Sequence, residues 1–164
     1  MITFVDFEEN LIPGFHAAFD SVAREKRYLA RTEAPPLETF TAAVMDNIAL
    51  GIPQVLALDE GVVVGWCQIM PHPRPTERHC GTLGMGLIAS HRGRGIGTRL
   101  VREALAKARS FGLERVELEV FEGNDAAVRL YEKVGFTREG KKIGAVKIDG
   151  APINNIQMAL FLSG

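Results

Sequence analysis

The fold of this chain is decided by the stretch His91-Arg92-Gly93-Arg94-Gly95-Ile96-Gly97-Thr98, which joins an expected strand to an expected helix. The apolar residues 82–89 before it are typical of a strand, and apolar residues recur at helical spacing after it. Glycines at the start of a helix let backbone N–H groups converge on an anion, and the helix dipole strengthens that attraction. The stretch therefore predicts a phosphate-binding loop.

Residues missing from this loop exclude two common nucleotide-binding motifs. A Walker loop requires a lysine after its last glycine, and none stands there. A dinucleotide fingerprint beginning at Gly95 would need a third glycine where Leu100 stands. A nucleotide-dependent regulator that binds ATP here is a weak alternative. What remains is the pattern Arg92-x-x-Gly95-x-Gly97.

Strands and helices alternate along the whole chain. We expect strands at 2–6, 54–58, 62–70, 82–89, 116–121, 136–148 and 153–162. We expect helices at 11–29 and 37–50, a third from Ile96 to a stop at Gly112, and a short fourth ended by Gly135. A loop with Pro71, Pro73 and Pro75 follows the third strand, and Asp149-Gly150 turns the last hairpin.

A second motif follows the phosphate loop at a distance of one helix. It consists of Leu118-Glu119-Val120, Asn124, Ala127, Leu130-Tyr131 and Gly135-Phe136. It resembles the L-x-V…N-x-x-A-x-x-L-Y-x-x-x-G-F stretch of the Gcn5-related N-acetyltransferases (GNAT), whose R/Q-x-x-G-x-G/A signature the phosphate loop also resembles. The resemblance implies an α/β (α+β) fold with helices on both faces of a mixed, mostly antiparallel sheet. About seven strands are expected, splayed between the fourth and fifth, in a single domain over residues 1–164.

The same resemblance implies that acetyl-coenzyme A binds at the loop. The implied contacts are the backbone of Leu87, Ile88 and Ala89, the loop residues Arg92, Gly93, Arg94, Gly95, Gly97 and Thr98, and the side chains of Asn124 and Tyr131. Asn124 is equally well explained as a plain helix cap. Arg99 and Arg102 are weaker candidates for the coenzyme's 3′-phosphate, and Gly84 and Gly86 fit a bulge in the fourth strand.

Two residues are the implied catalytic groups for transfer of an acetyl group to a primary amine. Tyr131 matches the family acid that protonates the leaving thiolate. Glu119 matches the base of the branch that acetylates ribosomal protein amino termini. Glu119 can also be explained as a solvated acid on the strand surface beside Glu117. In that case an ordered water relay, as in many family members, would act as the base. His79 and His91 are weaker candidates.

The acceptor is the least constrained part of the prediction. In the family it lies between the first two helices and the last hairpin, which suggests Glu25, Tyr28 and residues 144–152. The expected acceptor is a small molecule or a protein N-terminus. A non-catalytic acyl-coenzyme A-binding protein of the same fold is the alternative.

Composition limits which other classes of function and partner remain. The chain has 164 residues, 46% of them hydrophobic, and a net charge of −1, so nothing favours a nucleic-acid partner. Cys67 and Cys80 lack metal-ligand spacing, and no apolar run is long enough for a membrane span. With no signal peptide pattern in its first residues, we expect a cytoplasmic protein without a metal. By resemblance it can form a homodimer through terminal strands, where Ile156, Met158, Leu160 and Leu162 would suit a paired or buried strand.

Overall fold

A seven-stranded mixed sheet is the centre of the computed structural model, which describes residues 1–162. The strands are Ile2–Val5 (β1), Gln54–Asp59 (β2), Val62–Pro71 (β3), Cys80–Leu87 (β4), Arg115–Phe121 (β5), Thr137–Ile148 (β6) and Ala151–Phe161 (β7). Their order in the sheet is β1-β2-β3-β4-β5-β7-β6, and within residues 1–162 only β4 and β5 are parallel neighbours. The expected fold class is confirmed.

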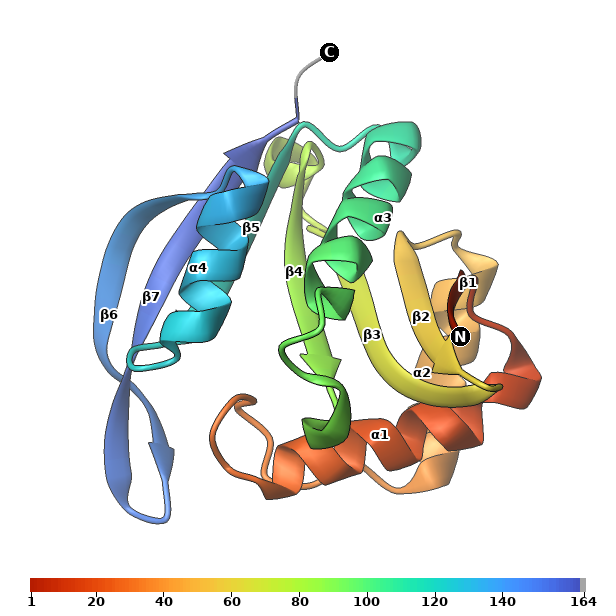
Figure 1. Ribbon diagram of the computed structural model, residues 1–164. Helices are drawn as coiled ribbons and strands as arrows, with labels where there is room; N and C mark the ends of the chain where they lie inside the picture. Colours follow the sequence, from red (N-terminus) through yellow and green to blue (C-terminus); the bar gives the residue numbers. More distant parts are fainter. Residues whose placement is uncertain (163–164) are drawn as a thin grey trace.

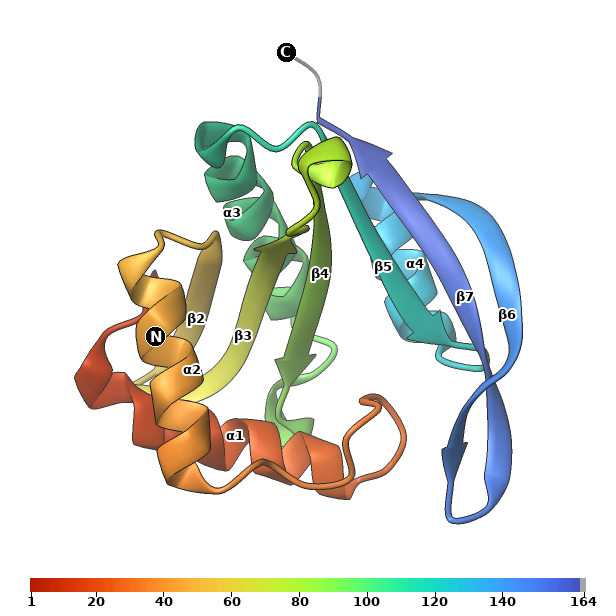
Figure 2. The ribbon, with the colours of Figure 1, turned by 180° about the vertical axis from the view of Figure 1, so that it is seen from behind.

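Four helices cover the two faces of the sheet. They are Ile12–Arg24 (α1), Leu37–Ala49 (α2), Ile96–Phe111 (α3) and Asp125–Val134 (α4), with short 3-10 turns at Glu9–Leu11, Pro75–Glu77 and Ala89–His91. Figure 1 shows α3 and α4 in front of the sheet, and Figure 2 shows α1 and α2 on the other face. No helix within residues 1–162 is both long and apolar enough to cross a membrane.

Each face of the sheet carries its own hydrophobic core. On the α3/α4 face, Leu100, Val101 and Ala104 of α3 are fully buried, as their helical spacing predicts. On the α1/α2 face, the ring of Phe15 packs against those of Phe40 and Trp66 at centroid distances of 4.9 and 5.6 Å. These cores fix β3 and β4 between α1 and α3.

The parallel pair β4–β5 separates shortly after it forms. Residues 80–82 pair with residues 115–117, and beyond them the two strands share no ladder. Residues 83–87 of β4 and 118–121 of β5 therefore flank a wedge that opens toward the start of α3 (Figure 1). We call this wedge the opening. It is the expected splay between the fourth and fifth strands.

The expected bulge in β4 is absent. The β3–β4 register runs without a shift from Gly65 opposite Leu87 to Pro71 opposite Gly81. Gly86 has a different reason to lack a side chain, because a Cβ there would lie 2.2 Å from the indole of Trp66. The glycine makes room for the aromatic core on the α1/α2 face.

The first helix is shorter than its apolar pattern suggests. It was expected over residues 11–29, but α1 ends at Arg24. Lys26 takes a left-handed backbone with φ of 57°, and its N–H donates to the carbonyl of Ala23 at 3.0 Å, which closes the last turn. Residues 25–28 therefore leave the helix and turn toward β4.

Two strand boundaries also differ from expectation. The predicted strand at 82–89 ends at Leu87, before the 3-10 turn. Pro71 was placed in a loop, yet it pairs with Gly81 in β3–β4. The next residue, His72, donates its N–H to the Cys80 carbonyl at 3.0 Å, so Pro71 occupies the non-hydrogen-bonded position of the ladder. Its missing N–H is not needed there.

The last hairpin turns where the sequence predicts. Asp149 and Gly150 both have positive φ, of 50° and 81°. β7 is an interior strand between β5 and β6, so Ile156 and Met158 are buried in the chain's own core, whereas β6 is exposed along most of its length. A dimer through the terminal strands would have to use β6.

Candidate active site

The loop before α3 offers unbonded backbone donors. Gly93 and Gly95 have φ of 74° and 79°, and no side chain of the described residues caps the helix. The first bond into the helix runs from the Arg99 N–H to the Gly95 carbonyl at 3.3 Å. The N–H groups of the first turn thus lack acceptors within residues 1–162 and carry the positive end of the helix dipole. Such a turn suits an anion.

Gly97 holds the start of α3 close to its neighbours. A Cβ at this position would lie 2.9 Å from Leu130 Cδ1 and 3.4 Å from Met85 Cε. The absence of a side chain lets the first turn of α3 pack between α4 and β4. The loop is thereby placed at the wide end of the opening (Figure 1).

Arg92 lies away from the donors of this loop. Its two terminal nitrogens donate to both carboxylate oxygens of Glu25, at 2.9 and 2.6 Å, and its Nε donates to the Leu87 carbonyl at 2.9 Å. The guanidinium also lies 4.5 Å from the ring centroid of Tyr28. The Arg92 guanidinium holds the pKa of the Glu25 carboxyl below its usual range. Arg92, predicted to bind the coenzyme, thus forms one cluster with Glu25 and Tyr28, which were predicted to bind the acceptor.

The free edge of β4 presents its own donor to the opening. The Ile88 N–H donates to the Val64 carbonyl of β3 at 2.9 Å, so it is not available to a ligand in the opening. Because N–H groups alternate in direction along an antiparallel strand, the N–H of Leu87 faces the opposite way, toward β5. Of the three residues predicted to offer backbone contacts, Leu87 therefore presents an N–H to the opening.

Tyr131 lies on α4, within the core on the α3/α4 face of the sheet. It is 7% exposed, and its ring meets Phe136 edge-on at 5.7 Å. No group in the described part of the chain hydrogen-bonds its hydroxyl, so the hydroxyl is free to donate to a ligand. Burial raises the pKa of the Tyr131 phenol, which keeps it protonated and able to donate.

Asn124 acts as the cap of α4. Its side-chain oxygen accepts from the Ala127 N–H at 3.3 Å. This is the plain structural explanation that the sequence left open, and the side-chain amide nitrogen still has two donors.

Glu119 lies on the opposite face of the sheet from Tyr131. Leu118 and Val120 point into the α3/α4 core, so Glu119 between them faces the α1/α2 side. Its carboxylate forms an ion pair with Lys142 of β6 and accepts a hydrogen bond from the Asn155 amide at 3.5 Å. The phenol of Tyr131 and the carboxylate of Glu119 therefore lie on opposite faces of the sheet.

A cavity of about 340 Å³ lies beside Glu119. Its charged lining residues are Arg115, Glu117, Glu119, Glu139 and Lys142, three acids against two bases. Arg115 is fully engaged, with 2.8 and 2.5 Å bonds to the two Glu139 oxygens and a 3.1 Å bond to Glu117. The surplus of negative charge favours a cationic or hydrogen-bond-donating ligand.

Sequence reasoning missed two polar residues beside this cavity. His72 lies at the end of β3, with its Nε2 2.7 Å from Thr82 Oγ1 and 3.6 Å from Glu117 Oε1. Asn155 is 7% exposed, and its Oδ1 has no hydrogen-bond partner among residues 1–162. No local motif marks either residue, because strand pairing alone brings them to this face.

The two histidines considered as bases are held elsewhere. His91 Nε2 lies 2.7 Å from Asp59 Oδ2, at the end of β2. His79 Nε2 lies 3.4 Å from the Cys80 sulfur, beyond the paired end of β4 and β5. Neither lines the cavity beside Glu119.

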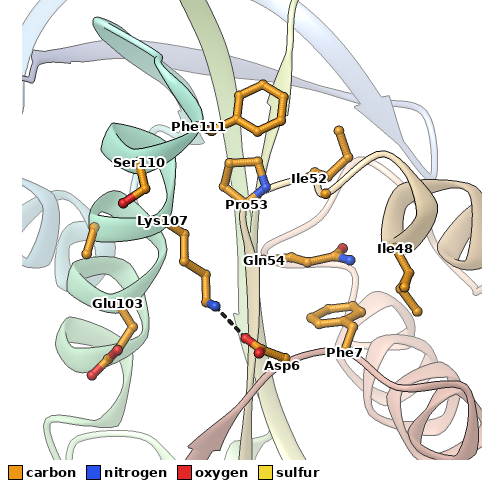
Figure 3. A pocket seen from close by; sticks show the side chains of 12 residues that line it. Asp6, Phe7, Ile48, Ile52, Pro53, Gln54, Glu103, Lys107, Ser110 and Phe111 are labelled. Atoms are coloured by element: carbon orange, nitrogen blue, oxygen red, sulfur yellow. Dashed lines mark hydrogen bonds and ion pairs between the residues drawn. The ribbon is translucent and has the colours of Figure 1, made fainter.

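A separate groove of about 800 Å³ lies on the other side of α3. Figure 3 shows Lys107 of α3 reaching across it to Asp6, with Phe7, Pro53 and Phe111 among the apolar walls. None of the predicted site residues lines it. Within residues 1–162, no three His, Cys, Asp or Glu side chains gather in a metal-binding cluster.

Comparison with known proteins places the fold in a family. The model of the acetyltransferase (GNAT) family matches residues 16–136. The chain belongs to the GNAT acetyltransferase family. The matched range contains the GNAT phosphate loop, β5 and α4. It ends at residue 136, and β6 begins at the next residue, Thr137.

Curated relatives match this GNAT chain over part of their length. The L-amino acid N-acetyltransferase AaaT of Escherichia coli (strain K12) is 34% identical over 91 residues, which are 55% of this chain and 56% of AaaT. The N-alpha-acetyltransferase RimI of Mycobacterium tuberculosis is 42% identical over 93 residues, 56% of each chain. The chain thus spans about half the length of these curated relatives.

Solved structures share the fold over nearly the whole chain. A GNAT-family acetyltransferase from Streptococcus pneumoniae has a TM-score of 0.92 at 24% identity and covers 99% of this chain and 100% of its own. The structure of yncA from Salmonella typhimurium with its cofactor acetyl-CoA has a TM-score of 0.94 at 18% identity, covering 100% of this chain and 95% of its own. At these identities the likeness supports the fold alone.

Proposed function

We propose that this protein transfers an acetyl group from acetyl-coenzyme A to a primary amine. One observation carries the proposal: a protonated phenol, Tyr131, and a carboxylate, Glu119, lie on opposite faces of the sheet, and the Leu87 N–H points into the opening from β4. The loop before α3 fits the second substrate, because its unbonded N–H groups and Arg94 suit a pyrophosphate. Thr98 lies in the same first turn.

The three groups divide the chemistry of acyl transfer among them. The coenzyme supplies the acetyl thioester. Glu119 accepts the proton that the amine nitrogen loses as it forms the new N–C bond. The Leu87 N–H stabilises the negative charge that develops on the carbonyl oxygen. Tyr131 donates its proton to the sulfur as the C–S bond breaks, and proton exchange with water restores both residues.

The acceptor class follows from the cavity beside Glu119. Its surplus of carboxylates favours an amine that arrives as an ammonium ion, which gives up one proton to water to become the neutral nucleophile that attacks the thioester. The curated relatives act, by their names, on L-amino acids and on protein amino termini, and both classes carry such an amine. We propose Glu25 and Tyr28 as part of the acceptor-side wall, where Arg92 holds them.

The direct test is release of free thiol from acetyl-coenzyme A with a panel of free amino acids, amino-acid amides and peptides of varied N-terminal residue. The expected result is amine-dependent turnover that Glu119→Gln and Tyr131→Phe reduce by about 10²-fold or more. Lys142→Met is the matched control, because it removes the ion pair but leaves the carboxylate. Coenzyme binding without turnover on any amine would favour the non-catalytic acyl-coenzyme A-binding alternative.

We also propose that the protein acts in the cytoplasm without a metal. Dimer formation through β6 is a further prediction that sedimentation velocity tests directly. The long exposed edge strand motivates it, because an unpaired edge is a template for pairing.

A further inference from the structure

Two consecutive residues after α1 are anchored on opposite sides of the opening. Glu25 is bonded through both carboxylate oxygens to Arg92, which follows β4. Lys26 Nζ lies 3.1 Å from both carboxylate oxygens of Asp149, at the tip of the β6–β7 hairpin. Since β4 and β7 flank β5 in the sheet, residues 25–28, held at Arg92, reach across the wide end of the opening through the Lys26 side chain. We call these residues the strap.

Both ribbon views show the same arrangement. In Figures 1 and 2 the loop after α1 lies between the lower end of β4 and the β6–β7 hairpin. The hairpin reaches this point because β7 extends past the end of β5, where Asn155 pairs with Phe121 and residues 151–154 continue beyond it. The strap and the hairpin tip thus meet beyond the last residue of β5.

The two anchors differ in strength. The Glu25–Arg92 pair is bidentate, is only 28% and 30% exposed at its side chains, and has an additional bond from Arg92 to the Leu87 carbonyl. The Lys26 and Asp149 side chains are 44% and 70% exposed, where a single ion pair is weak and salt-sensitive. The strap is therefore fixed at β4 and releasable at the hairpin.

Lys26 of the weak anchor has an uncommon backbone. Its φ is 57°, a left-handed conformation that residues other than glycine, asparagine and aspartate rarely adopt, whereas Asp149, with φ of 50°, is of a type that tolerates it in a turn. The surrounding turns hold these two residues so that their side chains meet across the opening. Local strain of this kind is found where a structure positions functional residues.

We propose that Lys26 and Asp149 form a latch that limits the size of the acceptor amine. This inference rests on the proposed function. With the latch closed, the acceptor reaches Glu119 only as a slender group passing beneath the strap. With the latch open, the strap swings about the Glu25–Arg92 anchor and admits bulkier chains. Lys26 and Asp149 are specificity-determining residues that take no part in proton transfer.

The test compares two acceptors, alaninamide and an alanine-initiated peptide of about ten residues. Asp149→Asn keeps a residue that tolerates left-handed backbone but removes the charge. We expect this variant to raise kcat/KM for the peptide relative to alaninamide by about three- to tenfold, with coenzyme affinity by calorimetry unchanged. Lys26→Met should act the same way. The double variant Lys26→Asp with Asp149→Lys should restore the wild-type ratio.

The salt dependence of the acceptor ratio provides a second, independent test of the latch. At about 0.5 M sodium chloride, where surface charges are largely screened, the wild-type ratio should approach that of Asp149→Asn, and the variant's ratio should hardly change. Glu8→Gln, which removes an exposed carboxylate elsewhere, should leave the ratio at its wild-type value. An equal acceptor ratio in wild type, Asp149→Asn and Lys26→Met would overturn the latch.

A readout without acetyl transfer separates this inference from the proposed function. Limited trypsin digestion should cut after Arg27 several-fold faster in Asp149→Asn than in wild type or Glu8→Gln. If wild type acetylated no amine of the panel used to test the proposed function, that function would fail, while the digestion rates would still test the strap. Equal cutting in all three proteins would contradict a latched strap.

Discussion

The side-chain amide of Asn155 donates to Glu119 Oε2 at 3.5 Å, while its own buried oxygen receives no hydrogen bond from residues 1–162. The opposite orientation of the amide would bring its oxygen against the carboxylate, so the donor must face Glu119. An unsatisfied buried carbonyl costs about 1–3 kcal/mol. The hydrogen bond from this amide makes Asn155 a candidate positioning residue for Glu119.

Replacing Asn155 by leucine should separate stability from activity. Leucine has a similar volume and no polar atoms, so we expect the free energy of unfolding to stay within about 1 kcal/mol of wild type or to rise. Because Glu119 loses its donor, kcat should fall by about tenfold, with the KM for acetyl-coenzyme A unchanged. Urea unfolding and steady-state kinetics measure both. A leucine variant with wild-type kcat would show that the amide has no role in positioning Glu119.

Tyr131→Phe should lower turnover without weakening the fold. The Tyr131 hydroxyl has no partner in the described chain, so its removal breaks no internal bond. General-acid catalysis is worth about 10²–10⁴-fold, which sets the expected loss of kcat. Calorimetry should give a coenzyme affinity within about threefold of wild type. Loss of affinity together with turnover would instead assign Tyr131 to binding.

Two glycines of β4 should respond differently to alanine. At Gly86 a Cβ would meet the Trp66 ring at 2.2 Å, whereas at Gly84 none of residues 1–162 lies within 4 Å of such a Cβ. Overpacking of this kind costs about 1–3 kcal/mol, so Gly86→Ala should lower the free energy of unfolding by at least that amount. Gly84→Ala should be neutral or slightly stabilising. Equal urea midpoints for the two variants would contradict the packing of Trp66 over Gly86.

The Glu25–Arg92 pair should make stability depend on pH. Arg92 lowers the pKa of the folded-state Glu25 carboxyl, so its stabilisation is present above the unfolded pKa of about 4.3 and is lost as pH falls through the lower folded value. Glu25→Gln should therefore be less stable than wild type by about 1 kcal/mol at neutral pH. The difference should shrink as the pH is lowered below about 4.3, measured by urea unfolding. A constant difference across this range would exclude the ion pair as its cause.

The sequence predicts the order of elements and most of the sheet, because these depend on local periodicity and turn residues. The helical spacing of Leu100, Ala104 and Ala108 and the Asp149-Gly150 turn are both found as expected. The end of α1 was missed, since the apolar pattern continues to Leu29 and only the backbone of Lys26 ends the helix. No local sequence pattern predicts that a lysine adopts a left-handed backbone.

The sequence predicts those residues of the candidate site that belong to a motif. It misses the residues that only strand pairing brings together. The phosphate loop, Glu119 and Tyr131 all lie along one continuous stretch. Arg92 was assigned to the phosphate side by its place in the motif, but its side chain bonds Glu25, 67 residues earlier. Asn155, Lys142 and His72 come together only through the sheet register, which no local pattern encodes.

Calorimetric titration with acetyl-coenzyme A tests the central claim most directly. It should compare wild type with Arg94→Glu in the loop, and with Arg109→Glu in the last turn of α3 as the matched control. The account predicts saturable binding of one coenzyme per chain by wild type and Arg109→Glu, and at least tenfold weaker binding by Arg94→Glu. A folded wild-type protein that binds no coenzyme, or equal binding by all three proteins, would contradict it.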